Sequence, residues 1–253
     1  MRLLVLGARA TGLIAAARAR GLFVLAVDRD PRAPGFALAH RRAILGCDDE
    51  PALERLVEAA RIEGVIATGP ETGAAARVAA RFRLPHPHAP ETAVLLGSRL
   101  RQRERLRDAG VPQLRWALVA KGADAGFPCV VTPRDRKGRR LAEEAPGAAE
   151  VTVTAFSAGG VLHPLLGSGP AAALARRSAE ALGVTDGITS TRLRLGVDGP
   201  RVVDVRAHAG DREAELCRLL HGIDVHALAL DAAFGRSRSA EDVRFGSADA
   251  QVA

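Results

Sequence analysis

The segment Phe127–Thr154, FPCVVTPRDRKGRRLAEEAPGAAEVTVT, carries the most specific pattern in the chain. Its apolar run, Cys129–Thr132, is typical of a buried β-strand and is followed by a proline. A basic, glycine-containing loop comes next, and an acidic pair, Glu143 and Glu144, then precedes a Pro-Gly turn. Glu150 opens a second strand, in which apolar and polar residues alternate.

This order resembles the nucleotide-binding segment of the ATP-grasp superfamily, and in particular the carbamoyl-phosphate-synthase-like carboxylate–amine ligases. In these proteins a strand carries a phosphate-binding Lys, a Gly-rich loop covers the phosphates, and two glutamates seven residues apart hold adenine and ribose. The resemblance implies that Glu143, Glu144 and Glu150 bind the nucleotide. Thr132 stands at the position of the phosphate-binding Lys, and Lys137 in the loop is the candidate to replace it.

A second similar segment begins at Gly97, with the sequence GSRLRQRERL, and continues to the Gly-Val-Pro turn that ends at Pro112. In the superfamily the corresponding segment carries a nucleotide-contacting Lys, and Arg99 holds that position here. The resemblance implies phosphate binding by Arg99, although a planar guanidinium places its charge differently from an ammonium.

The third similar segment is Gly196–His208, which resembles the hairpin that completes the ATP-grasp active site. There a Glu or Gln of the first strand and a Glu-x-Asn of the second strand hold magnesium. The resemblance implies that Asp204 is the metal ligand, that Ser190 holds the first-strand position, and that Arg206 replaces the Asn. Magnesium requires oxygen ligands, so one carboxylate beside a guanidinium makes a poor metal site. We therefore also expect an Asp204–Arg206 ion pair, and His208 stands where the superfamily has a phosphate-contacting Arg.

The resemblance also implies a shortened protein. Only ten positions separate Pro133 from Glu143, whereas the superfamily places a loop, a helix and a strand between them. Much of the lid over the phosphates is therefore expected to be missing, and such a lid serves to exclude water.

Composition narrows the class of protein. The 253 residues are 47% apolar, which excludes a disordered or fibrous chain. The net charge of +7 could attract a polyanion, but the arginines of segment 99–107 spread around a helix and have no aromatic residues between them for base stacking. We therefore expect no specific nucleic-acid partner.

No targeting or metal signal stands out. Three separated cysteines form neither a disulfide framework nor a zinc motif, and His86 and His88 are interpreted as part of a turn at a domain junction. No signal peptide or apolar run long enough to span a membrane is present. We expect a cytoplasmic protein without membrane partners.

Strands and helices alternate over residues 2–90 and predict a parallel sheet covered by helices. The expected strands are 3–6, 23–27, 43–45 and 65–67, and Asp48 and Asp49 are expected to cap a helix that starts near Glu50. We predict a Rossmann-like, pre-ATP-grasp domain at 1–90, a linker helix and strand at 91–126, a reduced ATP-grasp α+β domain at 127–235, and a flexible tail at 236–253. The polar tail is expected to bury little.

The glycine turn Gly7–Gly12 lies between a strand and a helix, as a dinucleotide fingerprint does, and Asp28 ends the next strand. Arg9 stands where the middle glycine would let the backbone approach a pyrophosphate. We therefore favour a tight turn with Asp28 capping a loop, and keep an NAD(P)-binding Rossmann protein as an alternative.

The fold class expected is α/β, with a parallel Rossmann-like sheet followed by a reduced ATP-grasp region. If active, the protein would use ATP and Mg2+ to join a small-molecule carboxylate to an amine through an acyl-phosphate. The alternative is a non-catalytic descendant that binds a nucleotide or metabolite, or that supports a partner enzyme or forms a homodimer.

Overall fold

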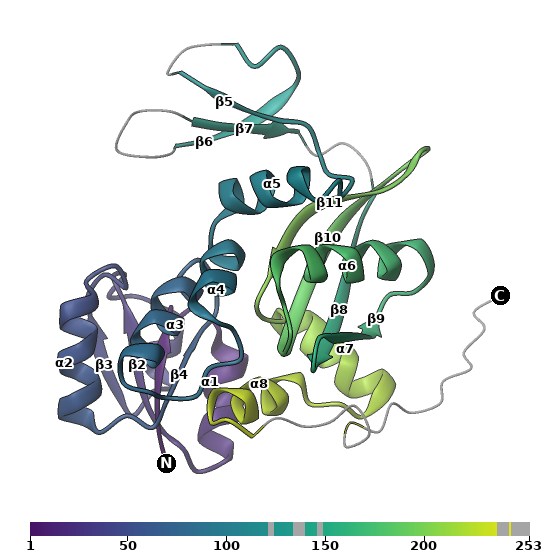
Figure 1. Cartoon of the computed structure of the whole chain (residues 1–253). Coiled ribbons are helices and arrows are strands. Elements are labelled where there is room, and N and C mark those ends of the chain that lie inside the picture. Colours follow the sequence, from purple (N-terminus) through teal and green to yellow (C-terminus); the bar gives the residue numbers. More distant parts are fainter. Residues whose placement is uncertain (121–123, 134–139, 146–148, 237–242, 244–253) are drawn as a thin grey trace.

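The structure is a computed structural model that describes residues 1–120, 124–133, 140–145, 149–236 and 243. Within these residues the strands form three sheets, and helices pack around two of them (Figure 1). The α/β fold class expected from the sequence is confirmed.

The N-terminal sheet is fully parallel, with strand order β3-β2-β1-β4. Its strands are β1 (Arg2–Leu6), β2 (Phe23–Asp28), β3 (Arg41–Ile44) and β4 (Gly64–Ala67). Three helices connect them or follow them: α1 (Thr11–Ala19), α2 (Glu50–Ala60) and α3 (Thr72–Arg81). A short 3-10 helix, Pro34–Ala37, precedes β3.

Both faces of this sheet are buried, which explains the continuous apolar runs of its central strands. Leu3 and Val5 face a core shared with α1, whereas Leu4 and Leu6 face a core shared with α2 and α3. The predicted helix cap is confirmed, because the Asp49 side chain accepts a hydrogen bond from the backbone N–H at the start of α2.

The C-terminal sheet is antiparallel, with strand order β11-β10-β8-β9. Its strands are β8 (Glu150–Ala158), β9 (Val161–Leu166), β10 (Gly187–Gly196) and β11 (Gly199–Arg206). The helix α6 (Gly169–Leu182) packs on one face and buries Leu174, Ala175 and Leu182 against β8, β10 and β11. The predicted hairpin around the Asp198-Gly199 turn is confirmed by the pairing of β10 with β11.

The third sheet is small and stands above α5 in Figure 1. Its order is β5-β7-β6, with β5 (Trp116–Val119), β6 (Cys129–Pro133) and β7 (Arg140–Glu144). The sequence analysis placed no strand at 140–144, because a segment rich in charge resembles a loop or an acidic turn. That expectation was wrong: Leu141 and Ala142 are buried in the central strand of this sheet.

Two consecutive helices join the N-terminal sheet to the small sheet: α4 (Pro90–Gly97) and α5 (Arg99–Asp108). The linker helix α5 was expected, but α4 was not. The helix α4 is short, and the residue before it, Ala89, provides no side-chain cap, so the local sequence signals its start only through the proline and Glu91 in its first turn.

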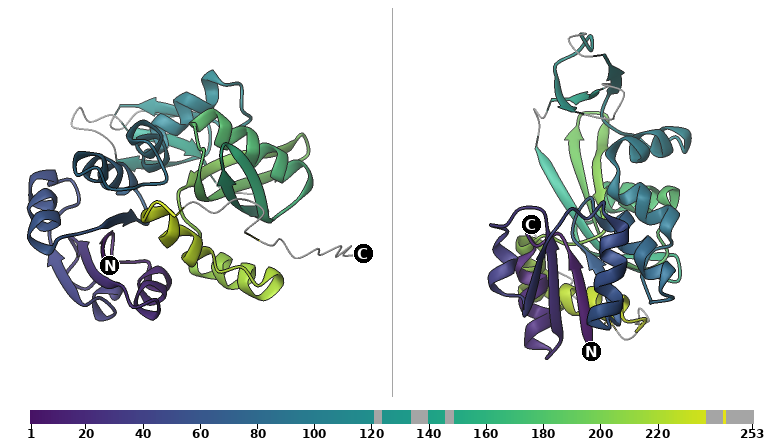
Figure 2. Two further views of the ribbon diagram at one scale, coloured as in Figure 1. Left: turned by 60° about the horizontal axis from the view of Figure 1, so that its bottom comes forward. Right: turned by 90° about the vertical axis from the view of Figure 1, so that its left-hand side faces the viewer.

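The last two helices are α7 (Asp211–His221) and α8 (Val225–Ala233). Although α8 follows the C-terminal sheet in the chain, its residues Leu230 and Ala233 enter the core on the α1 side of the N-terminal sheet. Figure 2 shows α8 beside the N-terminal part. The segment 127–235, predicted as one reduced ATP-grasp domain, thus contributes to both parts of the molecule.

In the C-terminal tail, expected to bury little, the described residue Val243 is buried. Val243 is 5% exposed and packs in a cluster with Phe156, Cys217 and Leu228. An isolated valine among polar residues lacks the periodicity that would mark it as a core residue.

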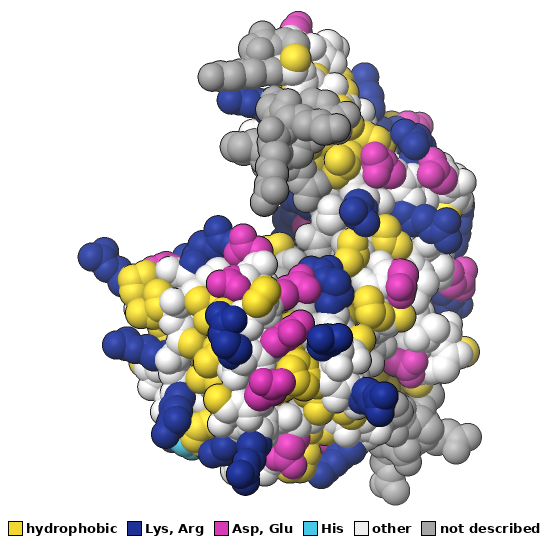
Figure 3. All heavy atoms as spheres, turned by 60° about the vertical axis from the view of Figure 1, so that its left-hand side comes forward, with side chains coloured by type: hydrophobic (Ala, Val, Ile, Leu, Met, Phe, Trp, Pro, Cys, Tyr) yellow, Lys and Arg dark blue, Asp and Glu magenta, His cyan; other side chains and the backbone are white. Residues whose placement is uncertain are grey.

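Charges of both signs are mixed on the face shown in Figure 3, where Lys and Arg side chains alternate with Asp and Glu. The arginines of α5 do spread around the helix as expected: Arg103 is buried, whereas Arg101 and Arg105 are exposed.

Among the described residues, no helix combines the length and the hydropathy that a membrane crossing requires.

Candidate functional site

The glycine turn between β1 and α1 is held by the protein itself. The backbone N–H of Ala8 donates to Asp28 (2.9 Å), so Asp28 caps the loop as the sequence analysis favoured. The hydroxyl of Thr11 donates to Asp211 of α7 (3.1 Å), and a Cβ at Gly12 would lie 2.4 Å from the same carboxylate. A carboxylate thus faces the start of α1, where a dinucleotide would place its pyrophosphate. The NAD(P) alternative therefore has no support in this geometry.

A cavity of about 390 Å³ lies where the N-terminal part meets the C-terminal sheet. Its walls come from three segments far apart in the sequence: the loop after β4, the junction of α4 with α5, and the end of β11. The lining residues are Thr68, Gly69, Pro70, Leu96, Gly97, Arg99, Gln102, Asp204, Val205, Arg206 and His208. Two predicted site residues, Arg99 and Asp204, therefore do meet in one cavity.

The carboxylate of Asp204 is buried and is bound by arginines. Arg192 lies directly opposite on β10 and donates two hydrogen bonds, from Nε to Oδ1 and from Nη2 to Oδ2, both at 2.9 Å. The predicted pair with Arg206 is also present (3.3 Å), and Arg99 lies 3.9 Å away. Burial raises the pKa of Asp204, but the hydrogen bonds from Arg192 and the nearby positive charges outweigh it and lower the pKa below its usual value.

Ser190, expected at the first-strand position of the metal site, does not lie across from Asp204. In the register of the hairpin Ser190 pairs with Arg206, and its hydroxyl lies 3.3 Å from that of Thr154. The position across from Asp204 belongs to Arg192, which the sequence analysis did not single out. The pairing of the two strands shifts at a bulge between Arg192 and Leu193. Because of this bulge, the number of residues between a position and the turn does not give its partner on the other strand.

The predicted nucleotide ligand Glu143 is also bound to arginines. It lies on β7, is 5% exposed, and accepts from the Nε of Arg103 (2.9 Å) and pairs with Arg99 (3.0 Å). Arg103 is itself 2% exposed and donates to the carbonyls of Val202 (2.9 Å) and Val203 (2.7 Å). Burial lowers the pKa of Arg103, and the Glu143 charge opposes that shift. Glu143 is therefore a buried member of an ion-pair network.

The other two predicted nucleotide ligands are also ion-paired, although less deeply. Glu144 pairs with Arg194 of β10 (3.2 Å), and Glu150 pairs with Arg192 (3.5 Å). All three glutamates thus face guanidinium groups. None of them lines the 390 Å³ cavity.

The remaining predicted ligands are Thr132 and Lys137. Thr132 lies in β6, where it pairs in register with Leu141 of β7. Lys137 lies outside the described residues. The expected role of Lys137 at the phosphates therefore stays a prediction.

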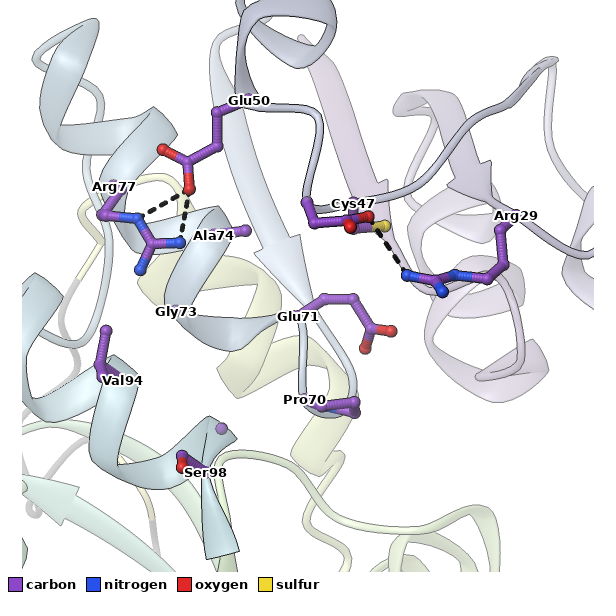
Figure 4. A pocket seen from close by; sticks show the side chains of 12 residues that line it. Arg29, Cys47, Glu50, Pro70, Glu71, Gly73, Ala74, Arg77, Val94 and Ser98 are labelled. Carbon is purple, nitrogen blue, oxygen red and sulfur yellow. Dashed lines mark hydrogen bonds and ion pairs between the residues drawn. The ribbon is translucent and has the colours of Figure 1, made fainter. Parts of the chain in front are cut away.

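A second cavity, of about 450 Å³, lies at the carboxyl edge of the N-terminal sheet and shares Pro70 and Gly97 with the first. Figure 4 shows Arg77 and Glu50 on one side, where Arg77 donates to Glu50 at 2.9 Å, and Arg29 on the other. The carboxylate of Glu71 points into the space between them. Burial raises the pKa of Glu71. None of the predicted site residues that the structure describes lines this cavity, because its lining is brought together from the ends of several strands.

The chain matches no known protein-family model. A formate-dependent phosphoribosylglycinamide formyltransferase from Burkholderia thailandensis is 35% identical over 147 residues, which are 52% of this chain and only 36% of that protein. The L-amino acid ligase from Bacillus licheniformis superposes with a TM-score of 0.78 at 18% identity, over 95% of this chain and 75% of that one. The phosphoribosylglycinamide synthetase from Anaerococcus prevotii gives 0.71 at 16% identity, over 93% and 75%.

The chain has the ATP-grasp fold. The resemblance stated from the sequence is therefore confirmed at the level of the fold. A further solved neighbour is an N5-carboxyaminoimidazole synthetase from Staphylococcus aureus complexed with ADP, with a TM-score of 0.70 at 14% identity, over 94% of this chain and 78% of that one.

The resemblance stated from the sequence implied ATP and magnesium, but the described residues do not fit the metal. Both oxygens of Asp204 accept hydrogen bonds from Arg192, and the guanidinium of Arg206 lies 3.3 Å from one of them. A divalent cation would have to displace these groups or lie beside their positive charges. Among the described residues, no group of three His, Cys, Asp or Glu side chains is close enough to hold a metal.

Proposed function

We propose that this chain is an ATP-grasp protein that binds an anionic ligand but does not catalyse ligation. The observation that supports this proposal is the bidentate pair between Arg192 and Asp204 across β10 and β11. In a phosphoryl-transfer site, metal ions bridge the phosphates and neutralise the charge that develops on them. Here the guanidinium of Arg192 binds Asp204, the carboxylate that the ATP-grasp resemblance assigns to the metal.

The ion pairs of the three glutamates predicted to bind the nucleotide support the same proposal. Glu143 is buried and would have to leave its arginine partners before it could bind adenine or ribose, and Glu144 and Glu150 are ion-paired as well. Breaking the Glu143 pair would also leave the buried Arg103 without its carboxylate, and a buried unpaired charge is costly. We therefore expect ATP to bind no more tightly than about 1 mM, which corresponds to only about 4 kcal/mol.

The second candidate is an active ATP-dependent carboxylate–amine ligase that works through an acyl-phosphate. The names of the similar proteins favour it: a formyltransferase among the curated relatives, and an amino acid ligase and a synthetase among the solved structures. In that case Arg99 and Lys137 would bind phosphates, Glu143 and Glu150 the nucleotide, and Asp204 the metal.

One experiment separates the two candidates. ADP release is measured with ATP, with and without Mg2+, in the presence of formate or mixed amino acids and amine acceptors. The non-catalytic proposal expects no Mg2+-dependent release above that of buffer. Mg2+-dependent release that disappears in Asp204→Asn, but persists in Asp198→Asn at the exposed tip of the same hairpin, would establish the ligase instead.

A further inference from the structure

The two arginines that line the 390 Å³ cavity still have free hydrogen-bonding capacity. Arg99 and Arg206 approach the same oxygen of Asp204, at 3.9 Å and 3.3 Å. Their side chains nevertheless stay 39% and 46% exposed. A guanidinium has five N–H donors, and the hydrogen bond of Arg206 to Asp204 uses only Nη2. Both arginines can therefore donate to a ligand without leaving Asp204.

Positive charge exceeds negative charge in the described ion pairs around Asp204 and Glu143. Four guanidinium groups face three carboxylates in the described ion pairs, namely Arg99, Arg103, Arg192 and Arg206 with Glu143, Glu150 and Asp204. His208 adds no charge near pH 7, because burial lowers its pKa to about 4. Its Nδ1 is buried and has no hydrogen-bond partner within the described part of the chain. The described ion pairs therefore leave one guanidinium charge to balance an anionic ligand.

The size and walls of the cavity select a small ligand. A volume of about 390 Å³ lies near the lower end of the usual range for small-molecule sites. The junction of α4 with α5 lies against the loop after β4, since a Cβ at Gly97 would be 2.8 Å from the carbonyl oxygen of Pro70. The glutamates expected to hold adenine and ribose lie outside the lining and are bound to arginines. The anionic end of a ligand can therefore enter this cavity, whereas the described lining residues include none of the three glutamates expected to bind a nucleoside.

We infer that the ligand is a compact dianion, a phosphate monoester or a dicarboxylate, which Arg99 and Arg206 bind without magnesium. This inference rests on the proposed function and names the chemical class of its ligand. One anionic group bridges the two guanidiniums, in the bidentate manner that arginine favours with phosphate and carboxylate. The second negative charge is balanced by the excess positive charge around Asp204.

The test is calorimetric titration of the full chain in EDTA with glycerol 3-phosphate, with succinate, and with ATP. We expect at least one of the two small dianions to bind at least about tenfold more tightly than ATP. Arg206→Ala should weaken that binding about tenfold, because a charge-assisted hydrogen bond is lost, and Arg206→Lys should weaken it less. Arg201→Ala is the matched control, since Arg201 lies on the same strand but pairs with Asp198 outside the cavity.

The two small dianions distinguish phosphate from carboxylate as the group recognised. Failure of both to bind, or equal effects of Arg206→Ala and Arg201→Ala, would overturn the inference. The inference would also be overturned if ATP bound more tightly in EDTA than either dianion does. These outcomes do not involve turnover, so they leave standing the proposal that the chain does not catalyse ligation, which fails only if Mg2+-dependent ADP release is found. Thermal unfolding of Arg206→Ala checks that this half-exposed position is not needed for folding.

Discussion

Arg192 and Asp204 face each other across β10 and β11 and form two parallel hydrogen bonds, both 2.9 Å long. The Asp204 side chain is nearly fully buried in this arrangement, whereas Arg192 is about a third exposed. The pKa of Arg192 is raised chiefly by the hydrogen bonds that it donates to the Asp204 carboxylate. A guanidinium thus supplies, from within the chain, the positive charge that a metal ion would bring to this carboxylate.

Replacing the arginines around Asp204 by oxygen ligands should create a metal site. In the double variant Arg192→Glu with Arg206→Asn, a carboxylate and an amide oxygen would join Asp204, which suits Mg2+. We expect Mg2+ to increase ATP affinity at least about tenfold in this variant, and not in the parent chain. Calorimetry measures the effect, and Arg201→Glu serves as the control for added negative charge on β11. A folded double variant without any Mg2+ dependence would show that this hairpin does not correspond to the metal site of the fold.

Removing the carboxylate of Glu143 should destabilise the protein strongly. Arg103 would then keep its carbonyl partners but lose its only acidic one among the described contacts. Breaking a buried ion pair in this way costs about 3–5 kcal/mol, and we expect Glu143→Ala to lower the free energy of unfolding by that amount. Urea denaturation measures it. Asp108→Ala, which removes an exposed partner of Arg107, should change stability by less than about 1 kcal/mol. Similar losses in the two variants would contradict the importance of the buried pair.

Stability should fall as the pH drops below about 6.5, in part because of His88. Burial lowers the pKa of His88 from 6.5 to about 3. Between these two values the unfolded chain binds a proton that the folded chain does not, so acid favours unfolding by up to about 1.4 kcal/mol per pH unit. His208, with a pKa lowered to about 4, acts in the same direction. In His88→Leu we expect the pH dependence to be reduced, as measured by urea denaturation at pH 7, 6 and 5. Parallel stability curves for the two proteins would mean that His88 is not buried in its neutral form.

The C-terminal tail should contribute to stability through Val243. Its side chain is 5% exposed, and burial of a valine is worth about 1.5–3 kcal/mol. We expect Val243→Ser to lower the free energy of unfolding by about 1–3 kcal/mol. Val197→Ser is the matched control, since Val197 is fully exposed at the tip of the β10–β11 hairpin. If both substitutions prove equally harmless, the tail does not pack on the core.

The sequence by itself determined most of the secondary structure and the class of fold. Alternation of apolar runs with amphipathic segments located the N-terminal strands, and Asp49 marked the start of α2, because such signals act between residues a few positions apart. The spacing around Glu143 and Asp204 indicated the ATP-grasp resemblance. Local signals failed where a segment was short or charged, as in α4 and in β7.

Only the tertiary structure decided what the candidate site residues do. Arg192 faces Asp204 because of the strand register and a bulge, and Arg103 reaches Glu143 from a helix forty residues earlier in the chain. In the same way α8 returns to the N-terminal core. Each contact joins groups that are far apart in sequence, and their charge state and availability depend on burial and on every neighbouring partner. No local pattern contains that information. The residue types therefore suggested a nucleotide and metal site, whereas in the folded chain arginines bind the carboxylates of that site.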